Sequence, residues 1–295
     1  MAVEDEVDRR PVARVAVRRW QVIAAVAVAV AALVYVLAVW TTAGQDLENA
    51  ALRGADQVDE AQVGEAWGAL DEITLYSLAA ATGLIALVGA LRRRWDLVVA
   101  SVGVIALGQV VVQVLKRFVL VRPALVQVTG DYTHNSLPSG HTAIAMTVLF
   151  AAVIVAPYRW RGVVMLVVLP WAVGIGQYTL TAKWHRLSDT LAADAIALAV
   201  AALASWWLAR RGALHRYEGR RRVGRVVIGS IAAVSALVGL VLGGILWGVP
   251  LVRVGAAGAA RDYEWAVYLG AGSFASAGSI TAALVFLLSW RRLAT

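Results

Sequence analysis

The chain contains no cysteine among its 295 residues, and it is also poor in charge. The lack of cysteine excludes disulfide bonds and thiolate metal sites. Charged residues make up 16% of the chain and hydrophobic residues 60%, whereas the apolar share of a soluble domain is about half. The mean hydropathy of +0.72 also shows that the chain is strongly apolar. These shortages exclude an ordinary soluble domain and indicate an integral membrane protein.

The few charged residues are clustered, so long uncharged stretches remain between them. A helix needs about 20 apolar residues to cross a bilayer, and we therefore predict an all-α polytopic membrane protein with about eight transmembrane helices. The first apolar run exceeds the roughly 7–15 residues of a signal-peptide core, so we expect no cleavable signal. The predicted spans lie near residues 20–42, 73–91, 97–115, 141–158, 162–182, 188–208, 226–249 and 266–290.

The predicted spans divide the chain into four parts. We expect a cytoplasmic basic tail at residues 1–19, a six-span core at 20–208, a basic cytoplasmic loop at 209–225 and two appended transmembrane helices at 226–295. The appended part is rich in small residues, with a Gly-x-x-x-Gly pattern at 239–243. Such faces permit close helix packing. They could dock within the chain or join two copies in a homo-oligomer.

Basic residues give the orientation of the chain. Cytoplasmic loops of membrane proteins are enriched in lysine and arginine, and with both termini cytoplasmic the inner segments hold 19 of the 27 basic residues. This distribution explains the net charge of +8 without a nucleic-acid partner, and we expect none. The arginine-rich run at 210–225 is explained by topology, and contact with anionic lipid headgroups is a second interpretation.

Five of the eight basic residues on the opposite, outer side lie at the ends of the third and fifth predicted spans. They include the only two lysines of the chain. Positive charge on this side does not follow the topology rule, and an anionic substrate would explain it. These residues are Lys116, Arg117, Arg122, Lys183 and Arg186.

The first motif in this region is LKRFVLVRPA, which places Lys116 and Arg122 after the third span. An arginine fork and a lysine ammonium suit the oxygens of one phosphate. Membrane helices also carry such residues at their ends simply as interfacial anchors. Taken alone, this motif does not distinguish an anion site from an anchor.

The second motif is PSGH at residues 138–141, immediately before the fourth span. Ser139 is a favourable N-cap residue, and Gly140 would let backbone amides approach a ligand. The N-terminus of a helix attracts anions, and His141 could give or take a proton there. A simple capped turn explains the proline, serine and glycine but not the histidine.

The third motif is KWHRLSD at residues 183–189. His185 and Asp189 are four residues apart, so on a helix they would share one face. A carboxylate that holds the imidazole Nδ1 leaves Nε2 free to attack, as in a catalytic triad. An interfacial His-Asp pair without chemistry is the alternative. Because all three motifs lie at span ends on the outer side, we expect them to form one site.

Together these residues resemble the type 2 phosphatidic acid phosphatase superfamily. Its pattern is a lysine followed by Arg-Pro, then Pro-Ser-Gly-His, then Ser-Arg, five residues, His, three residues and Asp. The second element stands intact at 138–141. Lys116 and Arg122 match the first element with one intervening residue fewer, and His185 and Asp189 match the third.

The resemblance covers roughly residues 73–208 and implies a phosphatase-like helical core. It implies that His185 attacks phosphorus, that Asp189 assists it, and that His141 acts as acid and then as base. It also implies that the phosphate is bound by Lys116, Arg122, Ser139 and the amides near Gly140, without a metal or another cofactor.

The chain departs from the family at one residue of the third element. Tyr178 and Thr179 stand in place of the family Ser-Arg, and Thr179 cannot supply the charge with which that arginine helps to bind phosphate. Lys183 is the candidate replacement. Asp194 is a further acid in the sixth span, either a partner of the site or a simple interfacial acid.

The resemblance and the predicted position of the site imply a hydrolase for a lipid phosphate or diphosphate. The enzyme would lie in the plasma membrane with its active site facing outward, and its partners would be the lipid substrate and membrane lipids. Polyprenyl diphosphate, phosphatidic acid and phosphatidylglycerol phosphate all fit. Phosphoryl transfer to a lipid or sugar, and non-catalytic binding or transport of a lipid phosphate, are the alternatives.

Overall fold

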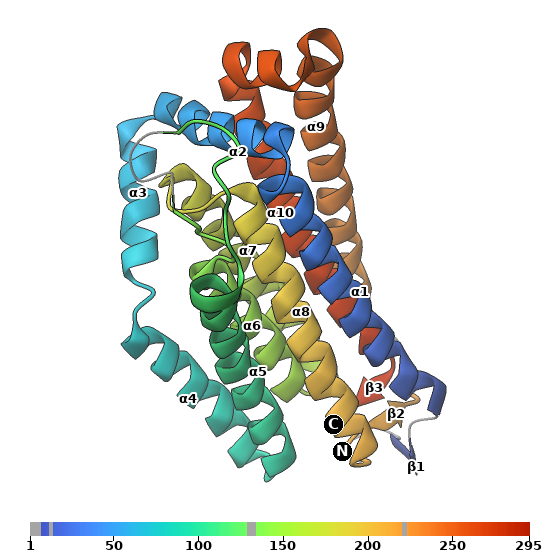
Figure 1. Cartoon of the computed structure of the whole chain (residues 1–295). Helices are drawn as coiled ribbons and strands as arrows, with labels where there is room; N and C mark the ends of the chain where they lie inside the picture. Colours follow the sequence, from blue (N-terminus) through green and yellow to red (C-terminus); the bar gives the residue numbers. More distant parts are fainter. Residues whose placement is uncertain (1–6, 12–13, 129–133, 220–222) are drawn as a thin grey trace.

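The structure is a computed structural model that describes residues 7–11, 14–128, 134–219 and 223–295. Long helices dominate it (Figure 1). The predicted tail at 1–19 and the predicted basic loop at 209–225 are described only in part, because each contains residues outside these ranges. The helices are α1 (Arg14–Val39), α2 (Thr42–Gly54), α3 (Glu60–Asp71), α4 (Leu75–Leu91), α5 (Trp95–Val114), α6 (Gly140–Val155), α7 (Arg161–Thr181), α8 (Leu187–Arg210), α9 (Val223–Asp262) and α10 (Glu264–Ser289).

Six of the described helices are long and apolar enough to cross a membrane: α1, α5, α7, α8, α9 and α10. A seventh span results if α3 and α4, which are bent by 61° at their junction, count as one. The structure thus agrees with a polytopic membrane protein, while the number of eight spans stays a prediction. The second and fourth predicted spans correspond to α4 and α6, which are shorter than predicted.

Local sequence explains both short helices. Thr74 and Ser77 form a capping box that begins α4 at Leu75, so the chain before it turns into the separate helix α3. Pro157 restricts the preceding residue, Ala156, to extended backbone. This ends α6 after 16 residues.

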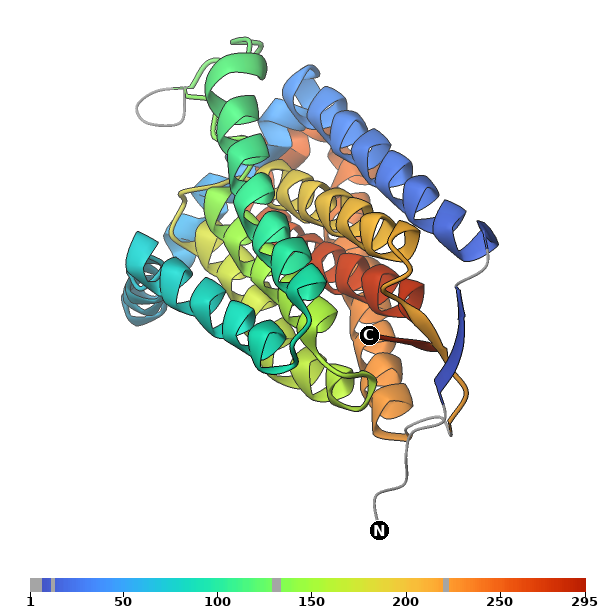
Figure 2. The same ribbon diagram turned by 90° about the horizontal axis from the view of Figure 1, so that it is seen from below.

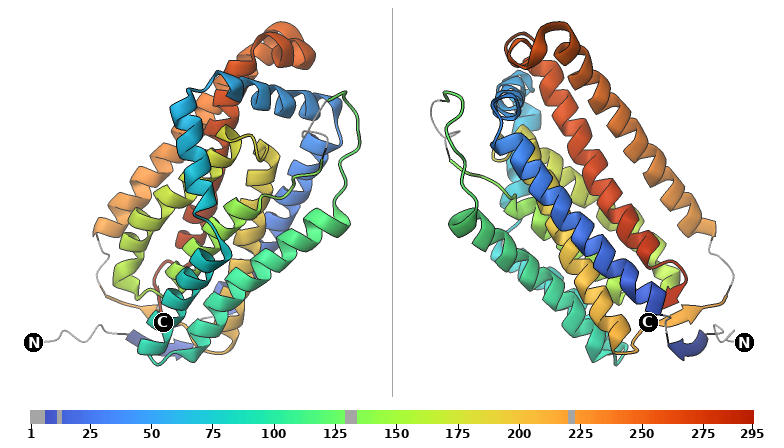
Figure 3. Two further views of the ribbon diagram at one scale, coloured as in Figure 1. Left: turned by 90° about the vertical axis from the view of Figure 1, so that its left-hand side faces the viewer. Right: turned by 45° about the vertical axis from the view of Figure 1, so that its right-hand side comes forward.

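The most buried of the six candidate spans is α8. It packs against α1, α5, α6 and α10, and its alanine-rich sequence lets neighbouring backbones approach closely. Figure 3 shows α1 and α10 running along α8 on one side of the molecule. Residues at the N-terminus of α8 are therefore held rigidly by several neighbours.

A small antiparallel sheet, which the sequence did not predict, closes one end of the helix bundle. It consists of β1 (Val7–Pro11), β2 (His215–Tyr217) and β3 (Leu293–Ala294) in that order. Figure 2 shows the strands side by side near the two chain ends. Such short strands carry no readable alternation of apolar and polar residues. The sheet puts the N-terminal segment, the loop after α8 and the C-terminal segment at one end of the molecule, and their cytoplasmic location stays a prediction.

The last two helices pack against each other and against the core within one chain. A Cβ at Gly239 would lie 3.0 Å from the Ser273 carbonyl oxygen, and one at Gly243 would lie 2.9 Å from the Phe274 ring. The small residues thus permit the contact of α9 with α10, as expected for docking within the chain. Association of two copies stays a prediction. The α9 helix also runs beyond the predicted span, with a break at Gly255, where φ is +71°.

Candidate active site

The predicted site residues come from the ends of α5 and α7 and the beginnings of α6 and α8. These ends lie at the side of the bundle that carries α2, opposite to the small sheet (Figure 1). Two helices between the first and second predicted spans, α2 and α3, contribute contacts to the same region. The three motifs are thus brought to one end of the molecule.

His185 and Asp189 form the central pair of this region. The Nδ1 atom of His185 lies 3.0 Å from Oδ2 of Asp189, and both side chains are buried. The predicted contact is present, but the predicted helical face is wrong. His185 lies in the turn before α8, and Asp189, in the first turn of α8, reaches back to it. The same carboxylate oxygen accepts a hydrogen bond from the Arg186 amide at 2.9 Å, so one acid caps α8 and orients the imidazole.

The Pro-Ser-Gly-His segment is joined directly to this pair. Ser139 is the N-cap of α6, as predicted, and its hydroxyl accepts the Thr142 amide hydrogen at 3.3 Å. Its own amide donates to the Asp189 carbonyl oxygen at 2.9 Å. The beginnings of α6 and α8 are therefore held together by a backbone hydrogen bond, and the first amides of α6 lie beside the His-Asp pair.

His141 lies next to His185, with ring centroids 6.4 Å apart. Trp184 packs between this region and α3, since its ring lies 5.3 Å from that of His141 and 4.8 Å from that of Trp67. The two tryptophans form an aromatic wall beside the histidines. Sequence reasoning missed this wall because Trp67 and Trp184 are more than 100 residues apart along the chain.

Lys116 lies at the end of α5 in a single π-helical turn, η2 (Leu115–Val119). Such turns are frequent at functional sites. Its ammonium is close enough to Asp189 and His141 for their charges to interact. The side-chain amide of Asn135 donates to the carbonyl of Leu120 at 3.0 Å and anchors the following loop on this turn. The structure thus places Lys116 in the same region as Asp189 and His141.

Arg122 is held by an acid that the sequence did not single out. Its Nη1 lies 3.2 Å from Oε2 of Glu48 in α2, and both side chains are almost fully buried. The other oxygen of Glu48 accepts the Ser188 amide at the beginning of α8, at 2.9 Å. Burial raises the pKa of Glu48, and the charge of Asp189 adds to this, while the contacts with Ser188 and Arg122 oppose it. Nη2 of Arg122 is buried without a hydrogen-bond partner among the described residues.

Thr179, at the position of the family arginine, contributes through its backbone. Its carbonyl oxygen accepts the amide hydrogens of Trp184 and His185, at 3.0 and 3.1 Å. Its hydroxyl donates to the Gly176 carbonyl at 2.8 Å. Thr179 therefore shapes the turn that presents the nucleophile candidate and carries no charge into the site.

Lys183, the expected replacement for the missing arginine, contacts an acid of the segment between α2 and α3. Its ammonium forms an ion pair with Asp56, and both side chains are partly exposed. Its backbone has a positive φ of 59°, in the turn after α7. A role of Lys183 in phosphate binding stays a prediction.

Arg186 is the cation that sequence reasoning did not assign to the site. It follows His185 directly and is 4% exposed. Its Nη1 donates to the Ser136 hydroxyl at 3.0 Å, and its Nη2 to the Asn49 side chain at 3.4 Å. The guanidinium thus lies between α2 and the loop that leads into α6. The sequence did offer one signal for this residue, since Arg186 is one of the five cations at the outer ends of the third and fifth predicted spans.

Asp194 belongs to helix packing rather than to this site. Its Oδ2 accepts the Ser279 hydroxyl of α10 at 2.8 Å, and both residues are buried. The acid therefore links the core to the appended helices. Its Oδ1 has no hydrogen-bond partner among the described residues.

Comparison with known proteins agrees with the geometry. The model of the PAP2 superfamily matches residues 97–213, from α5 to just beyond α8. No curated protein and no solved structure matches the chain. The matched segment contains all three motifs and the pair of histidines. Residues 97–213 thus match the PAP2 superfamily, and this match supports the resemblance to the type 2 phosphatidic acid phosphatase superfamily.

Proposed function

We propose that this protein is an integral membrane phosphatase that hydrolyses a lipid phosphate or diphosphate through a phosphohistidine intermediate. The match of residues 97–213 to the PAP2 superfamily supports phosphatase-type activity on a phosphorylated substrate. The observation that carries the proposal is the buried contact of His185 Nδ1 with Asp189 at 3.0 Å, with a second histidine beside it. This is the arrangement of an oriented nucleophile with a separate acid and base.

In the first step, Nε2 of His185 forms a bond to phosphorus while the bond from phosphorus to the leaving oxygen breaks. Asp189 holds the Nδ1 hydrogen and stabilises the positive charge that develops on the ring. His141, in its protonated form, gives its proton to the leaving oxygen. The lipid alcohol or lipid monophosphate then departs, and the phosphoryl group remains on His185.

In the second step, water attacks phosphorus and the bond to Nε2 breaks. His141, now neutral, takes the proton from the water. The step regenerates both histidines and releases inorganic phosphate. General acid-base assistance of this kind contributes about 10²–10⁴ to the rate.

The phosphate charge is balanced by cations and by the N-terminus of α6. Lys116 and the unpaired nitrogen of Arg122 supply two positive groups, and Ser139 with the amides at Gly140 supplies hydrogen bonds. Among the described residues, a Cβ at Gly140 would meet only the Gln113 side chain within 4 Å, at 3.6 Å. We add Arg186 to this set in place of Lys183. These groups stabilise the equatorial oxygens of the transition state electrostatically, and the mechanism uses no metal.

The position of the site favours a lipid substrate. The site lies at helix ends, at the side of the bundle opposite to the sheet that gathers the chain ends (Figure 1). The distribution of basic residues supports an outward-facing site in the plasma membrane. A lipid headgroup at the membrane surface would reach the histidines laterally. Polyprenyl diphosphate, phosphatidic acid and phosphatidylglycerol phosphate fit equally.

The test is phosphate release by the purified protein in detergent, with a panel of these three lipids and with EDTA. We expect release from at least one lipid, with no loss when the metal is chelated. Release that depends on metal contradicts the mechanism. Transfer of a labelled phosphoryl group to an added lipid or sugar, without release to water, identifies a phosphotransferase. Binding of the lipids without turnover identifies a non-catalytic member.

Replacing Arg186 by glutamine is expected to lower kcat/KM by about 10²-fold, because a buried guanidinium beside the nucleophile stabilises the phosphoryl oxygens. Replacing Lys183 by glutamine is the matched control. We expect a change of less than about threefold, since its partly exposed ion pair with Asp56 contributes little.

Arg186→Lys separates charge from geometry. We expect partial rescue relative to Arg186→Gln, because lysine keeps the charge but lacks the planar fork. Thermal unfolding of each variant reports any loss of structure. A larger loss of activity for Lys183→Gln than for Arg186→Gln would reverse the assignment.

A further inference from the structure

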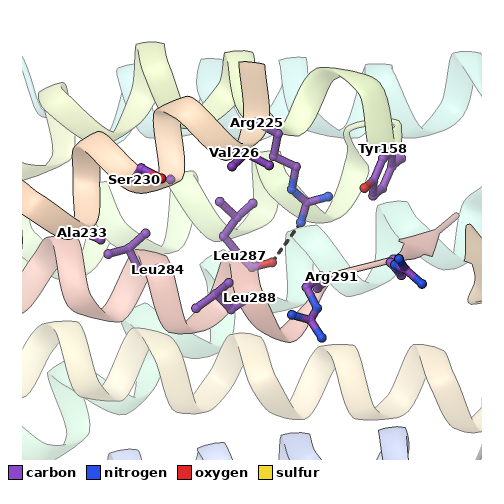
Figure 4. A pocket seen from close by; sticks show the side chains of 11 residues that line it. Tyr158, Arg225, Val226, Ser230, Ala233, Leu284, Leu287, Leu288 and Arg291 are labelled. Atoms are coloured by element: carbon purple, nitrogen blue, oxygen red, sulfur yellow. Dashed lines mark hydrogen bonds between the residues drawn. The ribbon is translucent and has the colours of Figure 1, made fainter. Parts of the chain in front are cut away.

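A pocket of about 320 Å³ lies at the opposite end of the molecule from the candidate active site. It is formed by the beginning of α9, the end of α10 and the residues that follow α10 (Figure 4). The lining residues are Tyr158, Arg225, Val226, Gly229, Ser230, Ala233, Leu284, Leu287, Leu288, Arg291 and Arg292. The pocket therefore belongs to the sheet end of the bundle and shares no residue with the proposed catalytic machinery.

Three arginines give this pocket its charge: Arg225, Arg291 and Arg292. No acidic residue is among the described residues that line it. Arg291 and Arg292 are exposed, so their guanidinium groups can reach a ligand in the pocket mouth. The pocket is thus suited to an anion.

Arg225 is the best-defined of the three arginines. Its Nη2 donates to the carbonyl oxygens of Leu287 and Trp290, at 3.0 and 3.4 Å, and its guanidinium lies 4.8 Å from the centre of the Tyr158 ring. Its Nη1 is buried, with no hydrogen-bond partner among the described residues. Figure 4 shows this side chain projecting between α9 and α10, next to Tyr158. A guanidinium fixed in this way contributes a stationary positive charge to the pocket wall.

The remaining wall of the pocket is apolar and continues onto the lipid-facing surface. Val226 and Leu288 are 53% and 61% exposed, and Leu284 and Ala233 extend the wall along the two helices. Both helices are candidate membrane spans. An occupant that matches this wall carries hydrocarbon chains next to its anionic group.

We propose that this pocket binds an anionic membrane phospholipid, with its phosphate on the three arginines and its acyl chains along α9 and α10. Basic pockets between membrane helices on the cytoplasmic side are suited to such headgroups. Arginine forms paired hydrogen bonds with phosphate oxygens. The site is separate from the catalytic site, and it does not depend on the proposed phosphatase activity.

The test is a titration of the delipidated protein with phosphatidylglycerol, followed by native mass spectrometry. Phosphatidylcholine with the same acyl chains serves as the neutral-headgroup comparison. We expect phosphatidylglycerol to bind more tightly than phosphatidylcholine. In the variant Arg291→Gln/Arg292→Gln we expect about 25-fold weaker binding of phosphatidylglycerol, since each arginine near a headgroup contributes about fivefold, or about 1 kcal/mol.

The matched control is Arg216→Gln, which removes an exposed arginine of β2 that does not line the pocket. We expect it to change the affinity by less than about twofold. Arg225→Gln is expected to weaken binding as well, and because Arg225 also holds the end of α10, the exposed pair Arg291 and Arg292 provides the decisive variant.

Two results would overturn the proposal. The first is an unchanged affinity in the Arg291→Gln/Arg292→Gln variant, or an equal loss in Arg216→Gln. The second is a result that shows no contribution from the acyl chains. We expect Ala233→Phe, which narrows the apolar wall, to weaken the binding of phosphatidylglycerol, so an unchanged affinity would contradict the proposal. We also expect that a tenfold excess of glycerol phosphate does not displace the lipid. Complete displacement by glycerol phosphate would show a site for a soluble anion instead.

Discussion

Replacing His185 by alanine is expected to lower phosphate release by at least about 10³-fold. The reason is that Nε2 forms the covalent bond to phosphorus, and removal of a nucleophile eliminates the pathway rather than slowing one step. Loss of release from the lipid that the wild-type protein hydrolyses best is the primary measurement. A labelled phosphoryl group should also be trapped on the wild-type protein as an acid-labile adduct and should be absent from the variant.

His215→Gln is the control for this experiment. His215 lies in β2, at the sheet end of the bundle, so its loss should leave phosphate release within about twofold. Activity retained by His185→Ala would refute the phosphohistidine mechanism. Equal losses in the two histidine variants would indicate damage to the fold, and thermal unfolding would show it.

Replacing Asp189 by asparagine is expected to lower kcat by about 10²–10⁴-fold with a small change in KM. An amide cannot stabilise the positive charge that develops on His185, and it can favour the wrong tautomer of the ring. Asparagine still offers one oxygen, which can accept the Arg186 amide and cap α8. We therefore expect α8 to remain folded, so that the loss reports on the imidazole.

Asp194→Asn provides a matched comparison for Asp189. It changes another buried acid of α8, one that contacts Ser279 and none of the motif residues in the described structure. We expect its activity to stay within about threefold of the wild type. If both variants lose activity equally, the contact of Asp189 with His185 is not the cause. A kcat unaffected by Asp189→Asn would remove the carboxylate from the mechanism.

Much of the candidate site was predictable because its signals are local in sequence. Ser139 caps α6 as predicted, since an N-cap depends on residues within one turn. The contact of His185 with Asp189 was predicted from a spacing of four residues, although a turn, and not a helix, presents the histidine. The sequence also predicted that the motifs lie at one end, because alternate span ends face the same side of a membrane.

The partners of the arginines could not be predicted in this way. Glu48 and Asn49 lie in α2, a helix that is not among the predicted spans. They meet Arg122 and Arg186 because α2 lies across the helix ends. The partner of Lys183 was equally unpredictable, since Asp56 lies well over 100 residues away along the chain.

The sequence by itself determined the membrane class, the three motifs and the placement of their residues at span ends. Hydrophobic length, helix capping and charge asymmetry are properties of short segments, and they act before any tertiary contact forms. Tertiary structure alone decided which side chains Arg122, Lys183 and Arg186 contact. It placed α2 over the arginines and α3 beside Trp184, and it joined three distant segments into the sheet. Those contacts depend on helix packing, which brings residues together without regard to their separation along the chain.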